Sequence, residues 1–193
     1  MSAATRPDWA TIPNLVTLLR FVLLAPVCVL LLDGPDTLAV VLLLVWASTD
    51  WVDGLLARLL DQTSRTGAII DPIAARVGLA GIVLSLAIAD LLSWAALAII
   101  VLVDLAMAVL ATGAALGGRI SVSWLGKVRT FVLMGSVFVL VAMAAWMPSL
   151  VPLAQVLFWI GVAMHTASGI DYILRARRAP ADAPVAAEPP SPR

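Results

Sequence analysis

The chain has 193 residues, of which 62% are hydrophobic and only 12% are charged, and its mean hydropathy is +1.06. Soluble domains are nearer half apolar and a quarter charged. This composition therefore excludes a soluble globular domain, a disordered acidic chain and a nucleic-acid-binding domain with a basic face. Twelve Lys and Arg balance twelve Asp and Glu, so net charge identifies no partner. The sequence predicts an integral membrane protein whose function depends on where its charges lie.

Six apolar stretches are long enough to cross a bilayer, whose hydrocarbon core takes roughly 20 residues of helix. They run over Leu15–Leu32, Thr37–Arg58, Gly67–Leu92, Trp94–Leu116, Val128–Met147 and Leu150–Leu174. Short links such as Asp33–Asp36 and Met147–Ser149 make the helices that they join antiparallel neighbours. We expect an all-α, six-transmembrane-helix bundle over residues 1–174, followed by a disordered, Ala- and Pro-rich cytoplasmic tail over residues 175–193.

Basic residues determine the expected orientation, because Lys and Arg gather in cytoplasmic loops. Three of the five links between spans carry no Lys or Arg. The basic residues lie before the first span, around the second and fourth links and after the sixth span, at Arg6, Arg58, Arg65, Arg119, Lys127, Arg129, Arg175, Arg177 and Arg178. The pattern predicts cytoplasmic termini in a multi-pass protein of the cell membrane, which in a bacterium is the inner membrane.

Three acidic residues lie at the expected cytoplasmic ends of the second and third spans. Asp50 and Asp53 lie about 60° apart on one helix face, and Asp71 follows in the next helix. Three converging carboxylates repel one another, and a divalent metal ion would relieve that repulsion. Ligation by oxygen alone suits Mg²⁺ or Mn²⁺. The spacing predicts a metal site at the cytoplasmic face.

Residues beside these carboxylates suit a phosphorylated ligand. Gly54 and Ala57 leave space for it near the helix backbone, and Arg58 offers two donors to a phosphate. The alternative is that the three Asp residues form structural ion pairs with Arg58, Arg65 and Arg76. The residues favour metal-assisted handling of a phosphorylated ligand.

The pattern Asp50-x2-Asp53-Gly54-x2-Ala57-Arg58-x8-Gly67-x3-Asp71 resembles the signature D-x2-D-G-x2-A-R-x8-G-x3-D-x3-D of the CDP-alcohol phosphatidyltransferases. Two further segments, IPNLVTLLRFVLLAP and SWLGKVRT, resemble parts of the phosphatidylglycerophosphate synthase branch of that family. In the second segment, Arg129 replaces a family Lys. The resemblance touches most of the chain, although its discriminating residues occupy three short patches.

This resemblance implies a site and a reaction. Two Mg²⁺ or Mn²⁺ ions would be held by Asp50, Asp53 and Asp71. CDP-diacylglycerol would contact Asn14, Thr17, Gly54, Ala57, Arg58, Ser64 and Gly67, and the acceptor phosphate would contact Lys127 and Arg129. The acceptor hydroxyl, from glycerol 3-phosphate or another alcohol, would attack the phosphate that bears diacylglycerol and release CMP. A homodimer in the lipid bilayer is also implied.

The chain departs from the signature at its fourth acidic position, where the family has its general base and Ala75 stands here. Loss of a general base typically lowers a rate about 10²–10⁴-fold, and loss of a ligand would weaken the second metal ion. Three explanations are open: a natural relative with little or no activity that still binds CDP-lipid, a deliberately disabled variant, or a base supplied by another group. The sequence therefore predicts a member of this family and leaves open whether it turns over its substrate.

Other functions and other polar residues have their own expectations. The acceptor alternatives are phosphatidylglycerol, in a cardiolipin-synthase-type reaction, and inositol phosphate, while Asp104 and the six spans alone motivate a small transporter. We expect Asp104 to form an interhelical hydrogen bond, His165 to be a packing residue and Asp171 to pair with Arg175. Arg20 is expected to extend its side chain to the lipid headgroups, with contact to a lipid-substrate phosphate as the alternative.

Overall fold

The computed structural model describes residues 11–60, 64–115 and 124–178. These residues form six long helices: α1 (Ile12–Leu32), α2 (Thr37–Leu59), α3 (Arg65–Ile88), α4 (Trp94–Ala115), α5 (Trp124–Trp146) and α6 (Val151–Arg178), with a short 3₁₀ turn, η1 (Pro148–Leu150), before α6. The described part of the chain contains no strand. The all-α fold is confirmed.

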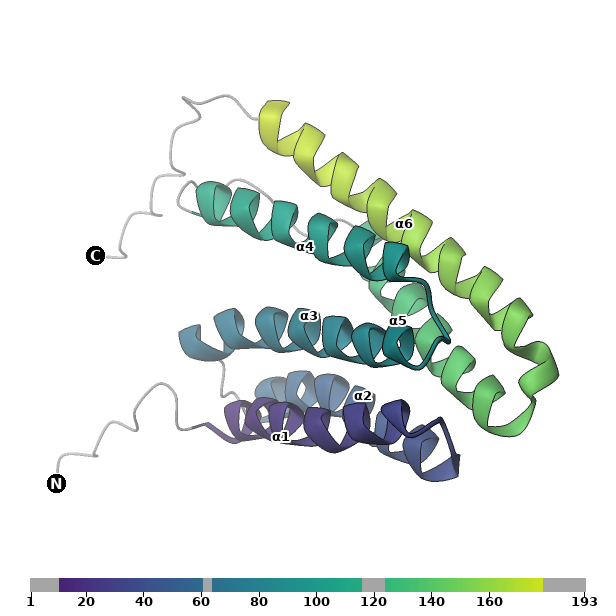
Figure 1. Ribbon diagram of the computed structural model, residues 1–193. Helices are drawn as coiled ribbons and strands as arrows, with labels where there is room; N and C mark the ends of the chain where they lie inside the picture. Colours follow the sequence, from purple (N-terminus) through teal and green to yellow (C-terminus); the bar gives the residue numbers. More distant parts are fainter. Residues whose placement is uncertain (1–10, 61–63, 116–123, 179–193) are drawn as a thin grey trace, which may run out of the picture.

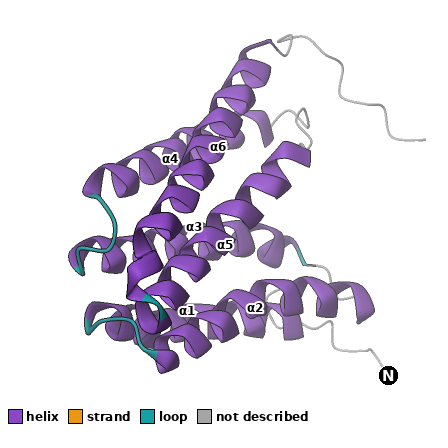
Figure 2. Ribbon diagram, turned by 90° about the vertical axis from the view of Figure 1, so that its right-hand side faces the viewer, coloured by secondary structure: helices purple, strands orange, loops and turns teal. Residues whose placement is uncertain are grey.

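The six helices pack in a ring. Neighbours in contact are α1 with α2 and α3, α5 with α2 and α6, and α4 with α3 and α6. In both views α1 and α2 lie on one side, α4 and α6 on the other, and α3 and α5 between them (Figures 1 and 2). The links 33–36, 89–93 and 147–150 lie together at one end of the bundle (Figure 1). The end of α2 and the start of α3 therefore lie at the opposite end of the bundle.

Five described helical segments are long and apolar enough to cross a membrane: Ile12–Leu32, Thr37–Leu59, Ile69–Ile88, Val128–Trp146 and Pro148–Arg175. In α4 the side chains are described over Trp94–Val109, and this apolar segment is shorter than the other five. Large apolar side chains remain exposed along the bundle, for example Leu18, Val22 and Leu153, as expected where lipid covers the protein. The protein is a multi-pass membrane protein.

The boundaries differ from the expected spans at several helix ends, and α5 begins at Trp124, four residues before the expected Val128. Helix α1 begins at Ile12, because the Thr11 side chain accepts from the Asn14 backbone N–H at 3.4 Å and caps an additional turn. Helix α3 ends at Ile88 rather than Leu92, since Asp90 has a φ of 58° and the N–H groups of Leu91 and Leu92 both donate to the carbonyl of Leu86. Helix α6 continues to Arg178, so the first four residues of the expected tail are helical.

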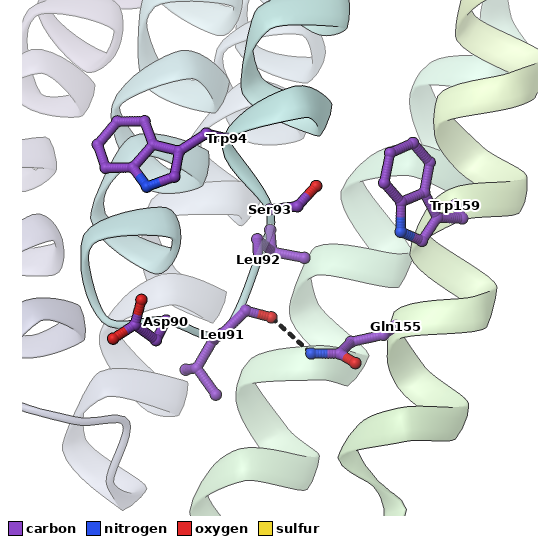
Figure 3. Close-up of a pocket in the computed structure, with 7 residues that line it drawn as sticks. All are labelled: Asp90, Leu91, Leu92, Ser93, Trp94, Gln155 and Trp159. Atoms are coloured by element: carbon purple, nitrogen blue, oxygen red, sulfur yellow. Dashed lines mark hydrogen bonds between the residues drawn. The ribbon is translucent and has the colours of Figure 1, made fainter.

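The turn between α3 and α4 is fixed by a contact from α6. Gln155 Nε2 donates to the carbonyl of Leu91 at 2.8 Å (Figure 3). Asp90, Trp94 and Trp159 border a hollow of about 380 Å³ beside this bond. Trp94 is 58% exposed and Trp146 is 54% exposed at this same end of the bundle, as expected for residues at a membrane interface. Trp9 and the side chain of Trp124, which also lie near the ends of expected spans, are outside the described residues.

Candidate active site

Threonine 17 of α1 joins the two helices that carry the acidic residues. Its side chain is 1% exposed, and its Oγ1 lies 2.5 Å from Asp71 Oδ1 on α3 and 3.4 Å from Asp53 Oδ2 on α2. Asp53 is itself 3% exposed. The predicted convergence of Asp53 with Asp71 is therefore present, and a residue of the first helix mediates it.

Arg20 lies one turn further along α1 and contacts the carboxylates of Asp50 and Asp53. Its Nη1 is 2.9 Å from Asp50 Oδ1, its Nη2 donates to Asp53 Oδ2, and its Nε donates to Thr49 Oγ1 at 3.1 Å. The Arg20 residue is 1% exposed. The prediction that this side chain extends to the headgroups is wrong, because Arg20 is buried and forms ion pairs with Asp50 and Asp53 of α2.

A second group of polar residues lies where α1 meets the start of α3. The Ser64 side chain caps α3 by accepting from the Gly67 N–H at 2.8 Å, and Asn14 Nδ2 donates to Ser64 Oγ at 3.1 Å. A Cβ at position 67 would lie 2.6 Å from Asn14 Oδ1. Asn14, Ser64 and Gly67, all expected to contact CDP-diacylglycerol, therefore form one helix–helix contact beside the carboxylates.

The end of α2 is more open. A Cβ added at Gly54 would meet nothing within 4 Å, Ala57 is half-buried and Arg58 is exposed. No ion pair joins Arg58 to a described carboxylate, and Arg76 pairs with Asp104 rather than with the three Asp residues. The alternative that Arg58 or Arg76 forms a structural ion pair with Asp50, Asp53 or Asp71 is therefore wrong among the described residues. The side chain of Arg65 lies outside the described residues.

Ala75 borders a cavity of about 570 Å³ between α2 and α5. Arg20 and Asp50 also line it, with Thr130 and apolar residues that include Trp46, Phe131, Met134 and Phe138. Asp50 supplies the one carboxylate of this described lining. Position 75 thus faces the same space as Asp50, and a methyl group stands there.

The residues at this site suit a divalent cation in charge and in donor type. The Arg20 guanidinium contacts two of the three carboxylates and Thr17 contacts the third, which leaves negative charge in excess, and all the donors are oxygen atoms, as Mg²⁺ prefers. Among the described residues, no three His, Cys, Asp or Glu side chains form a ready-made group of metal ligands. Arg20 and Thr17 bridge the carboxylates instead.

A separate polar cluster joins four helices. Asp104 Oδ1 on α4 lies 3.8 Å from Arg76 Nε on α3 and 3.5 Å from His165 Nε2 on α6. On α5, Arg129 Nη1 donates to Met107 Sδ at 3.2 Å. Arg129 Nε and His165 Nε2 are buried without a hydrogen-bond partner among the described residues. His165 is buried in the bundle, as expected of a packing residue, but it also faces the carboxylate of Asp104.

The residues expected to bind the acceptor are only partly described. Arg129 belongs to this cluster, while the backbone of Lys127 lies in α5 and its side chain lies outside the described residues. Asp171 and Arg175 form the expected pair at the end of α6, with Arg175 Nε 2.9 Å from Asp171 Oδ2.

The fold and this arrangement of aspartates define a membrane-embedded class of transferase. Residues 10–167 match the sequence profile of the CDP-alcohol phosphatidyltransferases, and the chain belongs to that family. It is 36% identical over 178 residues to the CDP-diacylglycerol–glycerol-3-phosphate 3-phosphatidyltransferase of Escherichia coli strain K12, which covers 86% of this chain and 94% of the relative. It is 30% identical over 184 residues to the probable phosphatidylglycerophosphate synthase of Mycobacterium tuberculosis strain H37Rv, covering 91% and 86%.

Sequence reasoning missed Arg20 as a partner of the aspartates, although a signal was present. The link 33–36 makes α1 and α2 antiparallel neighbours, so residues equally far from it lie at similar depth. Arg20 is twelve residues before Leu32, and Asp50 is thirteen residues after Thr37. This similar spacing places Arg20 and Asp50 at a similar depth on neighbouring helices, but it does not show which faces of the two helices meet.

Proposed function

We propose that this protein transfers a phosphatidyl group from CDP-diacylglycerol to glycerol 3-phosphate and releases CMP, at the cytoplasmic face of the membrane. The observation that carries the proposal is the convergence of Asp53 and Asp71 at Thr17 and of Asp50 and Asp53 at Arg20. The names of the similar proteins from E. coli and M. tuberculosis support the acceptor.

In this proposal Asp50, Asp53 and Asp71 would hold Mg²⁺ or Mn²⁺, which when bound would stabilise charge that develops on the pyrophosphate. Thr17 orients Asp71 by donating to it. Arg58 and the open space at Gly54 suit the phosphates and the nucleotide. As the acceptor oxygen forms its bond to the phosphate of diacylglycerol, the bond from that phosphate to CMP breaks.

We assign the acceptor phosphate to Arg129 and Lys127. Arg129 supports the assignment because its buried Nε has no partner among the described residues, and such a donor favours an anion. In the surrounding cluster two Arg residues, Arg76 and Arg129, lie near one carboxylate, Asp104. This excess of positive charge suits a phosphate better than a neutral alcohol.

Ala75 favours a second candidate function, a CDP-lipid-binding relative with little turnover. A methyl group cannot accept the proton of the acceptor hydroxyl, and this position borders the cavity that contains Asp50. In such a protein the same aspartates would bind CDP-diacylglycerol, and its role would be regulatory or that of a partner to an active transferase.

The test is CMP release by the purified protein in liposomes that contain CDP-diacylglycerol, with Mg²⁺ and one added acceptor at a time. We expect release with glycerol 3-phosphate that stops when EDTA removes the metal. If CMP were released only with phosphatidylglycerol or only with inositol phosphate, that alcohol would be the acceptor in place of glycerol 3-phosphate. Tight CDP-lipid binding with no release from any acceptor would establish the second candidate.

A further inference from the structure

We propose that Arg20 is a positioning residue for the aspartate site: its guanidinium holds Asp50 and Asp53 in the arrangement that binds a divalent cation. The inference rests on the metal site of the proposed function but not on turnover. The guanidinium contacts three side chains. Its Nη1 lies 2.9 Å from Asp50 Oδ1 as an ion pair without a hydrogen bond, its Nη2 donates to Asp53 Oδ2, and its Nε donates to Thr49 Oγ1 at 3.1 Å.

Arg20 is also fixed at its backbone. Its carbonyl accepts from Trp46 Nε1 at 3.0 Å, and Trp46 is 2% exposed. Thr49, which accepts from the Arg20 Nε, in turn donates to the carbonyl of Trp46 at 2.6 Å. The side chain is therefore held by α2 at both of its ends, and such a residue can determine where neighbouring carboxylates lie.

The two carboxylates need such a partner for different reasons. The Asp50 side chain is 64% exposed, and its ion pair with Arg20 ties it to the bundle. Asp53 is buried, and a buried carboxylate without a charged partner is unstable. Arg20 is the residue that contacts both, and it uses one oxygen of each. The second oxygen of each carboxylate is not used by Arg20.

Partners behind the ligands of a metal site orient those ligands, and their loss typically weakens metal binding about 10–100-fold. If Arg20 acted only through its charge, its removal would change the affinity for a cation in the opposite direction. Removal of a positive charge close to the site would make it more negative and would tighten cation binding. The direction of the change therefore separates positioning from simple charge balance.

The experiment is Mn²⁺ binding to the purified full chain in detergent, with free Mn²⁺ measured by electron paramagnetic resonance. We expect Arg20→Gln to weaken binding about 10–100-fold, and Arg20→Lys, which keeps the charge without the forked geometry, to fall between it and the unmodified protein. Arg175→Gln is the matched control, because it breaks an exposed Arg–Asp pair, and it should leave the affinity unchanged.

Thr49→Val keeps the fold testable if a change at the buried Arg20 prevents folding. It removes the acceptor of the Arg20 Nε while retaining both ion pairs, and we expect a smaller weakening in the same direction. Unchanged or tighter Mn²⁺ binding in folded Arg20→Gln, or in Thr49→Val if the former does not fold, would overturn the inference. CMP release is measured separately, so a protein that binds Mn²⁺ without turnover would contradict only the proposed function.

Discussion

The indole of Trp46 on α2 packs directly against the backbone of Gly78 on α3, where a Cβ at position 78 would overlap the Cζ2 atom of the ring. The ring cannot move freely, because its Nε1 donates to the carbonyl of Arg20 at 3.0 Å. This contact brings three helices together beneath the aspartates. It makes a glycine necessary at a position with ordinary helical geometry.

We expect Gly78→Ala to lower the free energy of unfolding by about 1–3 kcal/mol, the range for overpacking a filled core. Thermal unfolding of the purified protein in detergent measures the change. Gly135→Ala is the control, since a Cβ there meets nothing within 4 Å, and it should not destabilise. Equal stability of the two variants would show that the Trp46 contact does not constrain position 78.

Thr17→Val should lower the free energy of unfolding by about 1–3 kcal/mol, because it removes the donor to Asp71 from a site that is 1% exposed. Thr17→Ser retains the hydroxyl and should recover most of the loss. Chemical denaturation in detergent compares the two variants. If the Ser and Val proteins were equally destabilised, packing of the Thr17 methyl group, and not its hydrogen bond, would account for the effect.

Ala75→Asp should raise the rate of CMP release about 10²–10⁴-fold, the usual contribution of a general base. The carboxylate would enter the cavity that Asp50 already lines. Ala75→Asn is nearly the same size but cannot take a proton, so it should give no comparable increase. The same rate gain in both variants would mean that polarity in the cavity, rather than base catalysis, limits turnover.

Asp104 and His165 should be energetically coupled, because the His165 Nε2 lies 3.5 Å from Asp104 Oδ1 in a buried cluster. We expect Asp104→Asn and His165→Asn each to destabilise, and the double variant to cost about 0.5–3 kcal/mol less than the two single costs together. The exposed pair Asp171 and Arg175 gives the reference cycle, expected near 0.2–1 kcal/mol. Additive costs at Asp104 and His165 would contradict the contact.

The sequence was sufficient to predict the helices and the convergence of the aspartates, because both depend on local information. Apolar length sets the spans, the spacing of Asp50 and Asp53 gives them a shared face of α2, and Asp71 follows near the start of α3 at the same end of the bundle. The end of α3 was less predictable. Leu91 and Leu92 are as apolar as the helix before them, and only the positive φ of Asp90 shows where the helix stops.

The partners of the other charged residues depend on packing between distant segments. Asp104 contacts Arg76 and His165, which lie on two other helices, and hydropathy does not indicate which face of α4 meets them. The role of Arg20 was misjudged for a related reason. A lone Arg near the end of a span usually lies at the membrane–water interface. The position of Arg20 depends instead on the face of α2 that packs against α1 and carries Asp50 and Asp53.

The central claim is that Asp50, Asp53 and Asp71 form a divalent-cation-dependent site for a CDP-activated lipid, whether or not turnover is fast. The most direct measurement is the binding of CDP-diacylglycerol to the purified protein, with Mg²⁺ or with EDTA, for the unmodified chain and for Asp71→Asn. The account predicts binding that requires Mg²⁺ and that Asp71→Asn weakens strongly. Binding that is equally tight in EDTA, or unaffected by Asp71→Asn, would contradict it.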